Sequence, residues 1–271
     1  MIGFFDSGLG GLAIWKAVHE RLPELGTLYF GDQANSPYGI RSQEEIIALT
    51  KAGVDRLFQE GAVIVILACN TASAAALRSL QKDWLPFAWP DRRILGVLAP
   101  TVEAVTGQSW ANEAPMSKEV GSVAVFATPA TIASGAYVRE IQKRAPGLSV
   151  TGVACPNLVP LIESGAPQEE LQQEVMRYAK EAGEVDTAIL GCTHYALIAS
   201  AFKKALPESI VIDQGQAVAE SLEKYLKHHP ELQERILTAT YRFATSGSPV
   251  IVEPLAKRFA GIEGASWECW Q

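Results

Sequence analysis

Short apolar segments alternate with longer amphipathic segments along most of the chain. The apolar segments are rich in β-branched residues, which is typical of parallel strands that are covered on both faces. We predict strands at residues 2–5, 27–30, 63–68, 94–97, 120–126, 148–153, 188–190 and 210–212, and helices at 11–21, 44–59, 72–82, 131–144, 168–182 and 214–228. Such alternation predicts an α/β fold with mainly parallel sheets flanked by helices.

Local signals refine this pattern at three places. Ser42 and Glu45 have the spacing of a capping box, which marks a helix start. Residues 239–245 and 266–270 are expected to add further strands, and the aromatic tail is expected to pack on the first lobe or at a subunit contact. The polar segment 108–119 lacks periodicity and is predicted to be a loop near a domain crossing.

The composition limits the function classes. With 271 residues, 48% of them hydrophobic, the chain can form one large domain or two modest ones. A net charge of −7 argues against a broad nucleic-acid or anionic-lipid surface. The N-terminus lacks a basic signal-peptide region, and the longest apolar run, residues 62–69, is far too short to span a bilayer. Four widely spaced cysteines without a Cys-x-x-Cys pair predict reduced thiols and a cytoplasmic location.

Two pairs of similar segments suggest two similar lobes. Residues 3–7 and 124–128 each lead from a strand into a hydroxyl residue, Ser7 or Thr128. Residues 65–71 and 188–193 each lead from a strand into a cysteine and a threonine. The hydroxyl and the cysteine are 62 residues apart in the first pair and 64 in the second. Each lobe is therefore expected to present one hydroxyl and one thiol at strand ends.

Cys69 and Cys192 are the strongest chemical candidates, because each ends an apolar strand where a helix begins. In α/β proteins, ligands bind at the carboxyl ends of the parallel strands. A helix N-terminus there stabilises a thiolate or a carboxylate. His194 is an acid/base candidate beside Cys192, whereas Cys155 and Cys269 are interpreted as structural. The cysteines and histidines lack zinc-ligand spacing, so no metal site is expected.

Facing thiols suit a reaction that removes a proton from one face of a carbon and returns one to the other. An unperturbed thiol pKa of about 8.5 allows thiol and thiolate forms near neutrality. Such chemistry needs no redox cofactor.

The segment Gly8-x-Gly10-x-x-Ala13, with Asp32 after the next strand, supports a competing interpretation. It matches a dinucleotide-binding fingerprint and would indicate a nicotinamide-dependent oxidoreductase. Alternatively, the glycines bring backbone close to a small substrate that Asp6 and Ser7 face. Gln33 and Asn35 are interpreted as turn residues.

Seven motifs together resemble those of the bacterial glutamate racemases, in family order from residue 2 to about 215. They are FDSGLGG (5–11), YFGD (29–32), PYG (37–39), ACNTAS (68–73), ATPAT (127–131), ACP (154–156) and GCTHY (191–195). The resemblance implies cofactor-independent interconversion of L- and D-glutamate by two cysteines, which supplies D-glutamate for peptidoglycan. It also implies two α/β lobes, residues 1–98 plus 210–271 and residues 99–209, with the active site between them.

The same resemblance assigns roles to individual residues. Cys69 and Cys192 would be the catalytic acid/bases, with Asp6 assisting Cys69 and His194 assisting Cys192. Asp32 and Glu163 match further acidic residues of the family site. The residues that would hold the substrate are Ser7, Tyr38, Gly39, Asn70, Thr71, Thr128 and Thr193. A homodimer is one option for the oligomeric state.

The sequence departs from the family pattern in two loops. Asn35 stands where the family commonly has arginine, and Gln214 stands where it often has serine. The alternatives kept open are a racemase for aspartate or another amino acid, the nicotinamide-dependent oxidoreductase, and a non-catalytic amino-acid-binding protein.

Overall fold

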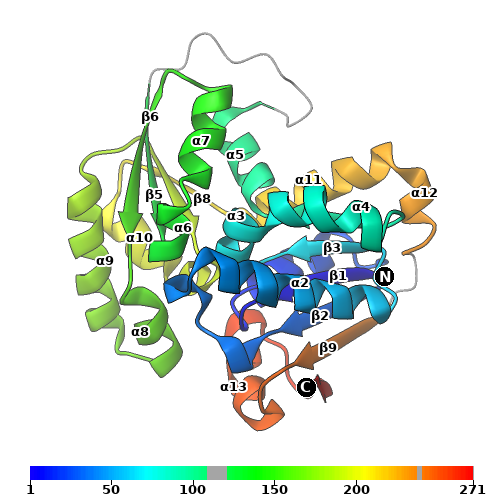
Figure 1. Ribbon diagram of the computed structural model, residues 1–271. Coiled ribbons are helices and arrows are strands. Elements are labelled where there is room, and N and C mark those ends of the chain that lie inside the picture. The colour runs from blue at the N-terminus through cyan, green and yellow to red at the C-terminus, as the bar shows by residue number, and fades with distance from the viewer. Residues whose placement is uncertain (109–120, 237–239, 271) are drawn as a thin grey trace.

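The strands of the protein form two sheets. The computed structural model describes residues 1–108, 121–236 and 240–270. Within these ranges every strand pairing is parallel. The first sheet has the order β10-β9-β2-β1-β3-β4, and the second has the order β6-β5-β7-β8. The predicted α/β class with two sheets is confirmed, and Figure 1 shows the two sheets with helices packed around them.

The first sheet contains β1 (Ile2–Asp6), β2 (Thr27–Gly31), β3 (Ile64–Leu67), β4 (Arg93–Gly96), β9 (Tyr241–Thr245) and β10 (Trp267–Cys269). The second contains β5 (Gly121–Ala127), β6 (Leu148–Ala154), β7 (Thr187–Gly191) and β8 (Ile210–Ile212). The α-helices are α1 (Leu12–Arg21), α2 (Gln43–Gln59), α3 (Asn70–Ser79), α4 (Leu85–Ala88), α5 (Leu98–Thr106), α6 (Pro129–Ala133), α7 (Ala136–Arg144), α8 (Leu158–Ser164), α9 (Gln168–Ala182), α10 (Ala199–Ala205), α11 (Gln214–His228), α12 (Pro230–Gln233) and α13 (Pro249–Ala260). Shorter helical turns are η1 (Gln33–Asn35), η2 (Tyr38–Ile40), η3 (Leu80–Trp84) and η4 (Thr193–Ile198).

Helix boundaries follow the local sequence. The predicted capping box is present, since the Ser42 side chain accepts from the Glu45 N–H and the Glu45 carboxylate accepts from the Ser42 N–H. The single helix predicted at residues 131–144 is instead two helices, α6 and α7. Gly135 between them has a left-handed φ of 62°, which interrupts the helical path.

One lobe boundary predicted from the sequence is wrong. Residues 210–212 were expected in the first lobe, but they form β8, which pairs in parallel with β7 of the second sheet. Their backbone groups find ladder partners there, so the chain returns to the first sheet only after Ile212. Helices α4, α5, α8, α10, α12 and α13 are not among the predicted ones. Residues 109–119 of the predicted loop and Ala239 of the predicted strand lie outside the described residues.

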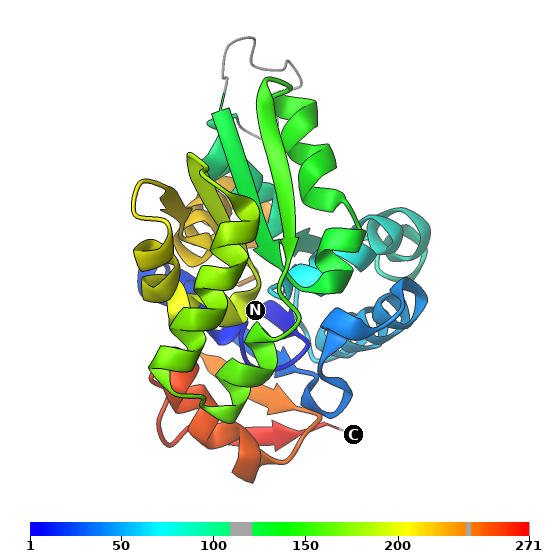
Figure 2. The ribbon, with the colours of Figure 1, turned by 90° about the vertical axis from the view of Figure 1, so that its left-hand side faces the viewer.

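The core of the first sheet occupies both of its faces. Phe4 and Phe5 are fully buried but pack in different hydrophobic clusters, because successive side chains of a strand point to opposite faces. The aromatic tail packs on this sheet, with the Trp270 ring 5.0 Å from that of Phe30. Figure 2 shows β9 and β10, in orange and red, at one end of the molecule. None of the described helices is both long and apolar enough to cross a membrane.

Candidate active site

Cys69 lies between the end of β3 and the start of α3. Its sulfur accepts a hydrogen bond from the backbone N–H of Ala72 at 3.4 Å, so it is the N-cap of the helix. The Ser7 hydroxyl, which follows β1, lies 3.4 Å from the same sulfur. Burial, reinforced by the nearby Asp6 carboxylate, raises the pKa of Cys69 to about 12. Cys69 therefore rests as a thiol at neutral pH.

Cys192 occupies the corresponding position after β7, but its surroundings differ. Its sulfur lies 3.9 Å from Nδ1 of His194, and Nε2 of His194 lies 2.9 Å from the Glu163 carboxylate. Burial alone would lower the pKa of His194, but the hydrogen bonds to Cys192 and Glu163 raise it to about 10. A protonated imidazole next to the sulfur stabilises a thiolate.

Asp6 ends β1 and is fully buried. Its Oδ2 accepts from the backbone N–H of Gly8 at 3.0 Å, whereas Oδ1 has no hydrogen-bond partner among the described residues. Burial raises the pKa of Asp6, although the charge of His194 and the Gly8 N–H act in the opposite direction. A carboxyl group poised in this way can accept or release a proton near the Cys69 sulfur.

The two cysteines line one cavity of about 130 Å³ between the sheets. Ten of the thirteen site residues expected from the sequence form its wall: Ser7, Tyr38, Gly39, Cys69, Asn70, Thr71, Thr128, Cys192, Thr193 and His194. The other three, Asp6, Asp32 and Glu163, are carboxylates that lie behind this wall. Neutral donors, the two cysteine sulfurs and the His194 imidazole thus face the cavity, while the three carboxyl groups lie behind its wall.

Helix starts supply donors around the cavity. Residues 70 and 71 open α3, where the first backbone N–H groups of a helix have no intrahelical partner. The hydroxyl oxygens of Thr71 and Thr128 lie 3.0 Å apart, and Thr131 is within 3.1 Å of both. This arrangement suits a bound carboxylate. The sequence did not reveal Thr131, whose only local signal is its place three residues after the Thr128 N-cap.

A family model for Asp/Glu/Hydantoin racemases matches residues 12–222 of the chain. The chain belongs to this family. A glutamate racemase of Paracoccus denitrificans is 46% identical over 263 residues, which cover 95% of this chain and 96% of that protein.

Solved structures of the racemase family have the same fold. A glutamate racemase from Francisella tularensis in complex with D-glutamate matches with a TM-score of 0.85 and 29% identity, over 100% of this chain and 97% of that one. A glutamate racemase isoform from Bacillus anthracis matches with a TM-score of 0.86 and 30% identity over the same shares. These matches confirm the resemblance noted in the sequence.

The glycine-rich loop of this racemase serves close packing. A Cβ atom at Gly10 would overlap the side chains of Thr193 and His194 from the second lobe. The space that a dinucleotide pyrophosphate would need against this turn is therefore filled by protein. Family membership and this contact overturn the oxidoreductase interpretation.

Asp32 contacts the cavity wall through Tyr38. Its carboxylate accepts from the Tyr38 hydroxyl at 2.6 Å, from Ser246 at 2.7 Å and from the Asn35 amide at 3.0 and 3.1 Å. Asn35 lies in the turn η1, as expected, and its amide donates to both oxygens of Asp32. Gly39 must stay small, since a Cβ there would lie 2.7 Å from Cβ of Thr128.

The remaining cysteines differ from each other. Cys155 was interpreted as structural, yet it is buried and lines the cavity. Its thiol donates to the Val153 carbonyl at 3.5 Å, and burial raises its pKa, so it stays protonated. Cys269 is exposed. Among the described residues, His, Cys, Asp and Glu form no cluster of three or more able to hold a metal ion.

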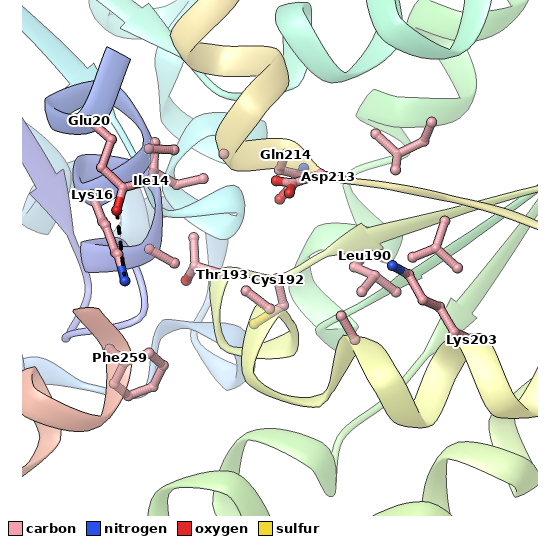
Figure 3. A pocket seen from close by; sticks show the side chains of 17 residues that line it. Ile14, Lys16, Glu20, Leu190, Cys192, Thr193, Lys203, Asp213, Gln214 and Phe259 are labelled. Atoms are coloured by element: carbon pink, nitrogen blue, oxygen red, sulfur yellow. Dashed lines mark ion pairs between the residues drawn. The ribbon is translucent and has the colours of Figure 1, made fainter. Parts of the chain in front are cut away.

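A second cavity of about 280 Å³ lies on the other side of Cys192 and Thr193 (Figure 3). It is bordered by α1, by the start of α11 and by Phe259 of α13. Lys16 and Glu20 on α1 form an ion pair of 3.9 Å at its edge. The loop that carries Cys192 is therefore a thin partition between two cavities.

Proposed function

We propose that this protein is a glutamate racemase that interconverts L- and D-glutamate and so supplies D-glutamate for peptidoglycan. The observation that carries the proposal is the placement of Cys69 and Cys192, which come from different sheets and line one cavity. Family membership and 46% identity to a glutamate racemase support the choice of substrate.

In the proposed reaction, protons move across the substrate Cα. One cysteine sulfur, as thiolate, removes the Cα proton and becomes a thiol, while the opposite thiol gives its proton to the other face. The two cysteines thereby exchange protonation states. The raised pKa of Cys69 favours its thiol form in the resting enzyme, and the imidazole of His194 lies beside the Cys192 sulfur.

The other expected residues fit supporting roles in this proposal. Asp6 would exchange a proton with Cys69, and Glu163 would hold His194 toward Cys192 through the 2.9 Å contact. The first-turn N–H groups of α3 and the threonine hydroxyls would bind substrate carboxylates and stabilise the carbanion-like transition state. Asp32 would position Tyr38.

A deuterium-exchange experiment tests the proposal. Purified protein is incubated with L-glutamate in D₂O without added cofactor, and ¹H NMR and chiral chromatography are used to follow the substrate. Loss of the Cα proton signal together with formation of D-glutamate is expected. Exchange with L-aspartate but not glutamate would point to a different substrate, and binding without exchange would indicate a non-catalytic protein.

Three further assignments belong to this proposal. We place the first lobe at residues 1–98 and 213–271 and the second at 99–212, which agrees with the strands of each sheet. Four cysteines without disulfides favour a cytoplasmic location. A homodimer stays a prediction, and analytical ultracentrifugation would test it.

A further inference from the structure

Gln214 is the first residue of α11, directly after the chain leaves the second sheet. Its side chain is buried, with 7% exposed. Figure 3 shows it where α11 begins, beside the loop of Cys192 and Thr193. A buried amide at this point must find hydrogen-bond partners or lose free energy on folding.

Its partners come from three different helices. Oε1 of Gln214 accepts from the Asn70 amide of α3 at 2.8 Å. Nε2 lies 3.0 Å from the Thr101 hydroxyl of α5 and 2.8 Å from the Tyr137 hydroxyl of α7. The Tyr137 hydroxyl in turn donates to Oδ1 of Asn70 at 2.6 Å. These four side chains, from residues 70, 101, 137 and 214, are called the interlobe polar cluster below.

Donor counting fixes the orientation of the amide. The Thr101 hydroxyl gives its proton to the Val97 carbonyl at 2.7 Å, and Tyr137 gives its proton to Asn70. Both hydroxyl oxygens must therefore accept from Nε2 of Gln214, which also lies 3.2 Å from Oδ1 of Asn70. Burial raises the pKa of Tyr137, so its hydroxyl remains a donor. Serine, which the family often has at this position, has one donor on a shorter side chain and cannot make the same set of hydrogen bonds.

The interlobe polar cluster joins the parts of the chain that carry the chemistry. Asn70 follows Cys69 directly, and Tyr137 belongs to the second lobe. Thr101 lies in α5, the last described helix before the second sheet, and Gln214 opens the first described helix after the chain returns. The Gln214 amide thus links the two segments where the chain passes between the lobes, α5 and the start of α11. It also links both of them to the start of α3. The Asn70 amide is held toward the cluster at both ends, since its Oδ1 accepts from Tyr137 and Gln214 and its Nδ2 donates to Gln214.

We infer that Gln214 is a positioning residue that, through Asn70, sets the Cys69 end of α3 against the second lobe. This inference rests on the proposed racemase function. It assigns a role in that reaction to Gln214, which is not among the site residues expected from the sequence. A displacement of Cys69 relative to the Cys192 side slows proton transfer more than it weakens substrate binding, since reaction rates depend steeply on the geometry of the reacting groups.

Steady-state kinetics of glutamate racemisation test the inference. Gln214→Glu keeps the size and the acceptor but removes both donors. We expect its kcat to fall on the order of 10- to 100-fold, with KM changed by less than about threefold. Gln216→Glu is the matched control, because Gln216 is exposed on the same helix, and it should retain wild-type kcat. Each enzyme is assayed well below its unfolding midpoint, and rates are divided by the folded fraction from near-UV circular dichroism.

A double-mutant cycle with Tyr137→Phe distinguishes a shared positioning role from two unrelated effects on kcat. Because both changes disrupt the same cluster, the double variant should be little slower than the slower single variant. Losses that multiply, or a wild-type kcat in Gln214→Glu, would overturn the inference. If Gln214→Glu does not fold, Thr101→Val removes one acceptor of the same amide without changing the side-chain shape, and a smaller loss of kcat is expected. Absence of racemisation in the wild-type protein would instead refute the proposed function.

Discussion

At the scale of single residues, the two cysteines have similar sequence contexts but different proton environments. Cys69 has a hydroxyl and a buried carboxyl group near it, whereas Cys192 has an imidazole held by a carboxylate. A reaction that runs in both directions needs one sulfur to start as a base and the other as an acid. The neighbours of the two sulfurs differ in this way, with a hydroxyl beside Cys69 and an imidazole beside Cys192.

Replacement of either cavity cysteine tests the two-thiol mechanism. Serine preserves the size and polarity of the side chain but is a far weaker acid and base near neutral pH. In Cys69→Ser and in Cys192→Ser we expect kcat to fall on the order of 10²–10⁴-fold, measured by circular dichroism at a wavelength that distinguishes the glutamate enantiomers. Cys269→Ser, at an exposed site, is the control and should keep full activity. Full activity in either cavity variant would exclude the mechanism.

The raised pKa of His194 makes part of the stability depend on pH. Its pKa is about 10 in the folded protein against 6.5 as the reference value. Its contribution to the unfolding free energy is therefore fully present below pH 6.5 and is lost as the pH rises through about 10. Urea denaturation of the wild type and of His194→Asn across this window should show a stability difference that shrinks toward high pH. A difference that grows with pH would contradict the assignment.

Residue-scale prediction from the sequence was good where the signal is local. A strand followed by cysteine and threonine is visible in a few residues, and both thiols were found in this way. Asn70, Thr101, Tyr137 and Gln214 are brought together across up to 144 residues of chain, so no local pattern shows that they share hydrogen bonds.

At the scale of elements, the apolar segments predict all the described strands, whereas several described helices and one helix break are missed. Strands β1, β2 and β3 are short and fully buried, which makes their apolar runs conspicuous. The split between α6 and α7 escaped prediction, because Gly135 was counted as an ordinary helical residue. Helix α13 was missed since two prolines, Pro249 at its start and Pro254 inside it, conceal a helical segment.

The capping box at the start of α2 is a local source of stability. Ser42→Ala removes the acceptor for the Glu45 N–H and should lower the unfolding free energy by about 1 kcal/mol. Chemical denaturation measures this difference. The neighbouring exposed residue Gln43 provides the control, and Gln43→Ala should leave stability nearly unchanged. Equal losses in the two variants would show that the cap contributes nothing specific.

At the scale of the whole molecule, the two lobes are joined by buried polar contacts as well as by the chain. Glu140 of α7 accepts from Arg144 at 2.8 Å and also contacts Arg78 of α3. Glu140 and Arg144 are both buried, while the Arg78 side chain is largely exposed. The sequence predicted two lobes from its repeated motifs but not these contacts, because the relative placement of lobes depends on side chains that are distant in sequence.

Changes at Glu140 and at its exposed partner Arg78 should have unequal effects. Glu140→Gln removes the charge that Arg144 bonds in a buried position, so we expect a loss of about 3 kcal/mol in unfolding free energy. Arg78→Ala removes an exposed partner and should cost no more than about 1 kcal/mol. Thermal and chemical denaturation of the two variants compare these values. A larger loss in Arg78→Ala would show that the exposed pair dominates.

The strand order of the first sheet also bears on how the chain is made. β2 pairs with β1 on one side and with β9 on the other, yet β9 begins only at Tyr241. During synthesis the whole second sheet leaves the ribosome before β2 acquires its outer neighbour. Until then β2 is an open edge, and open edges pair readily with other chains. The nascent protein is thus most prone to aggregation late in translation, and a truncation before residue 241 should leave that edge permanently open.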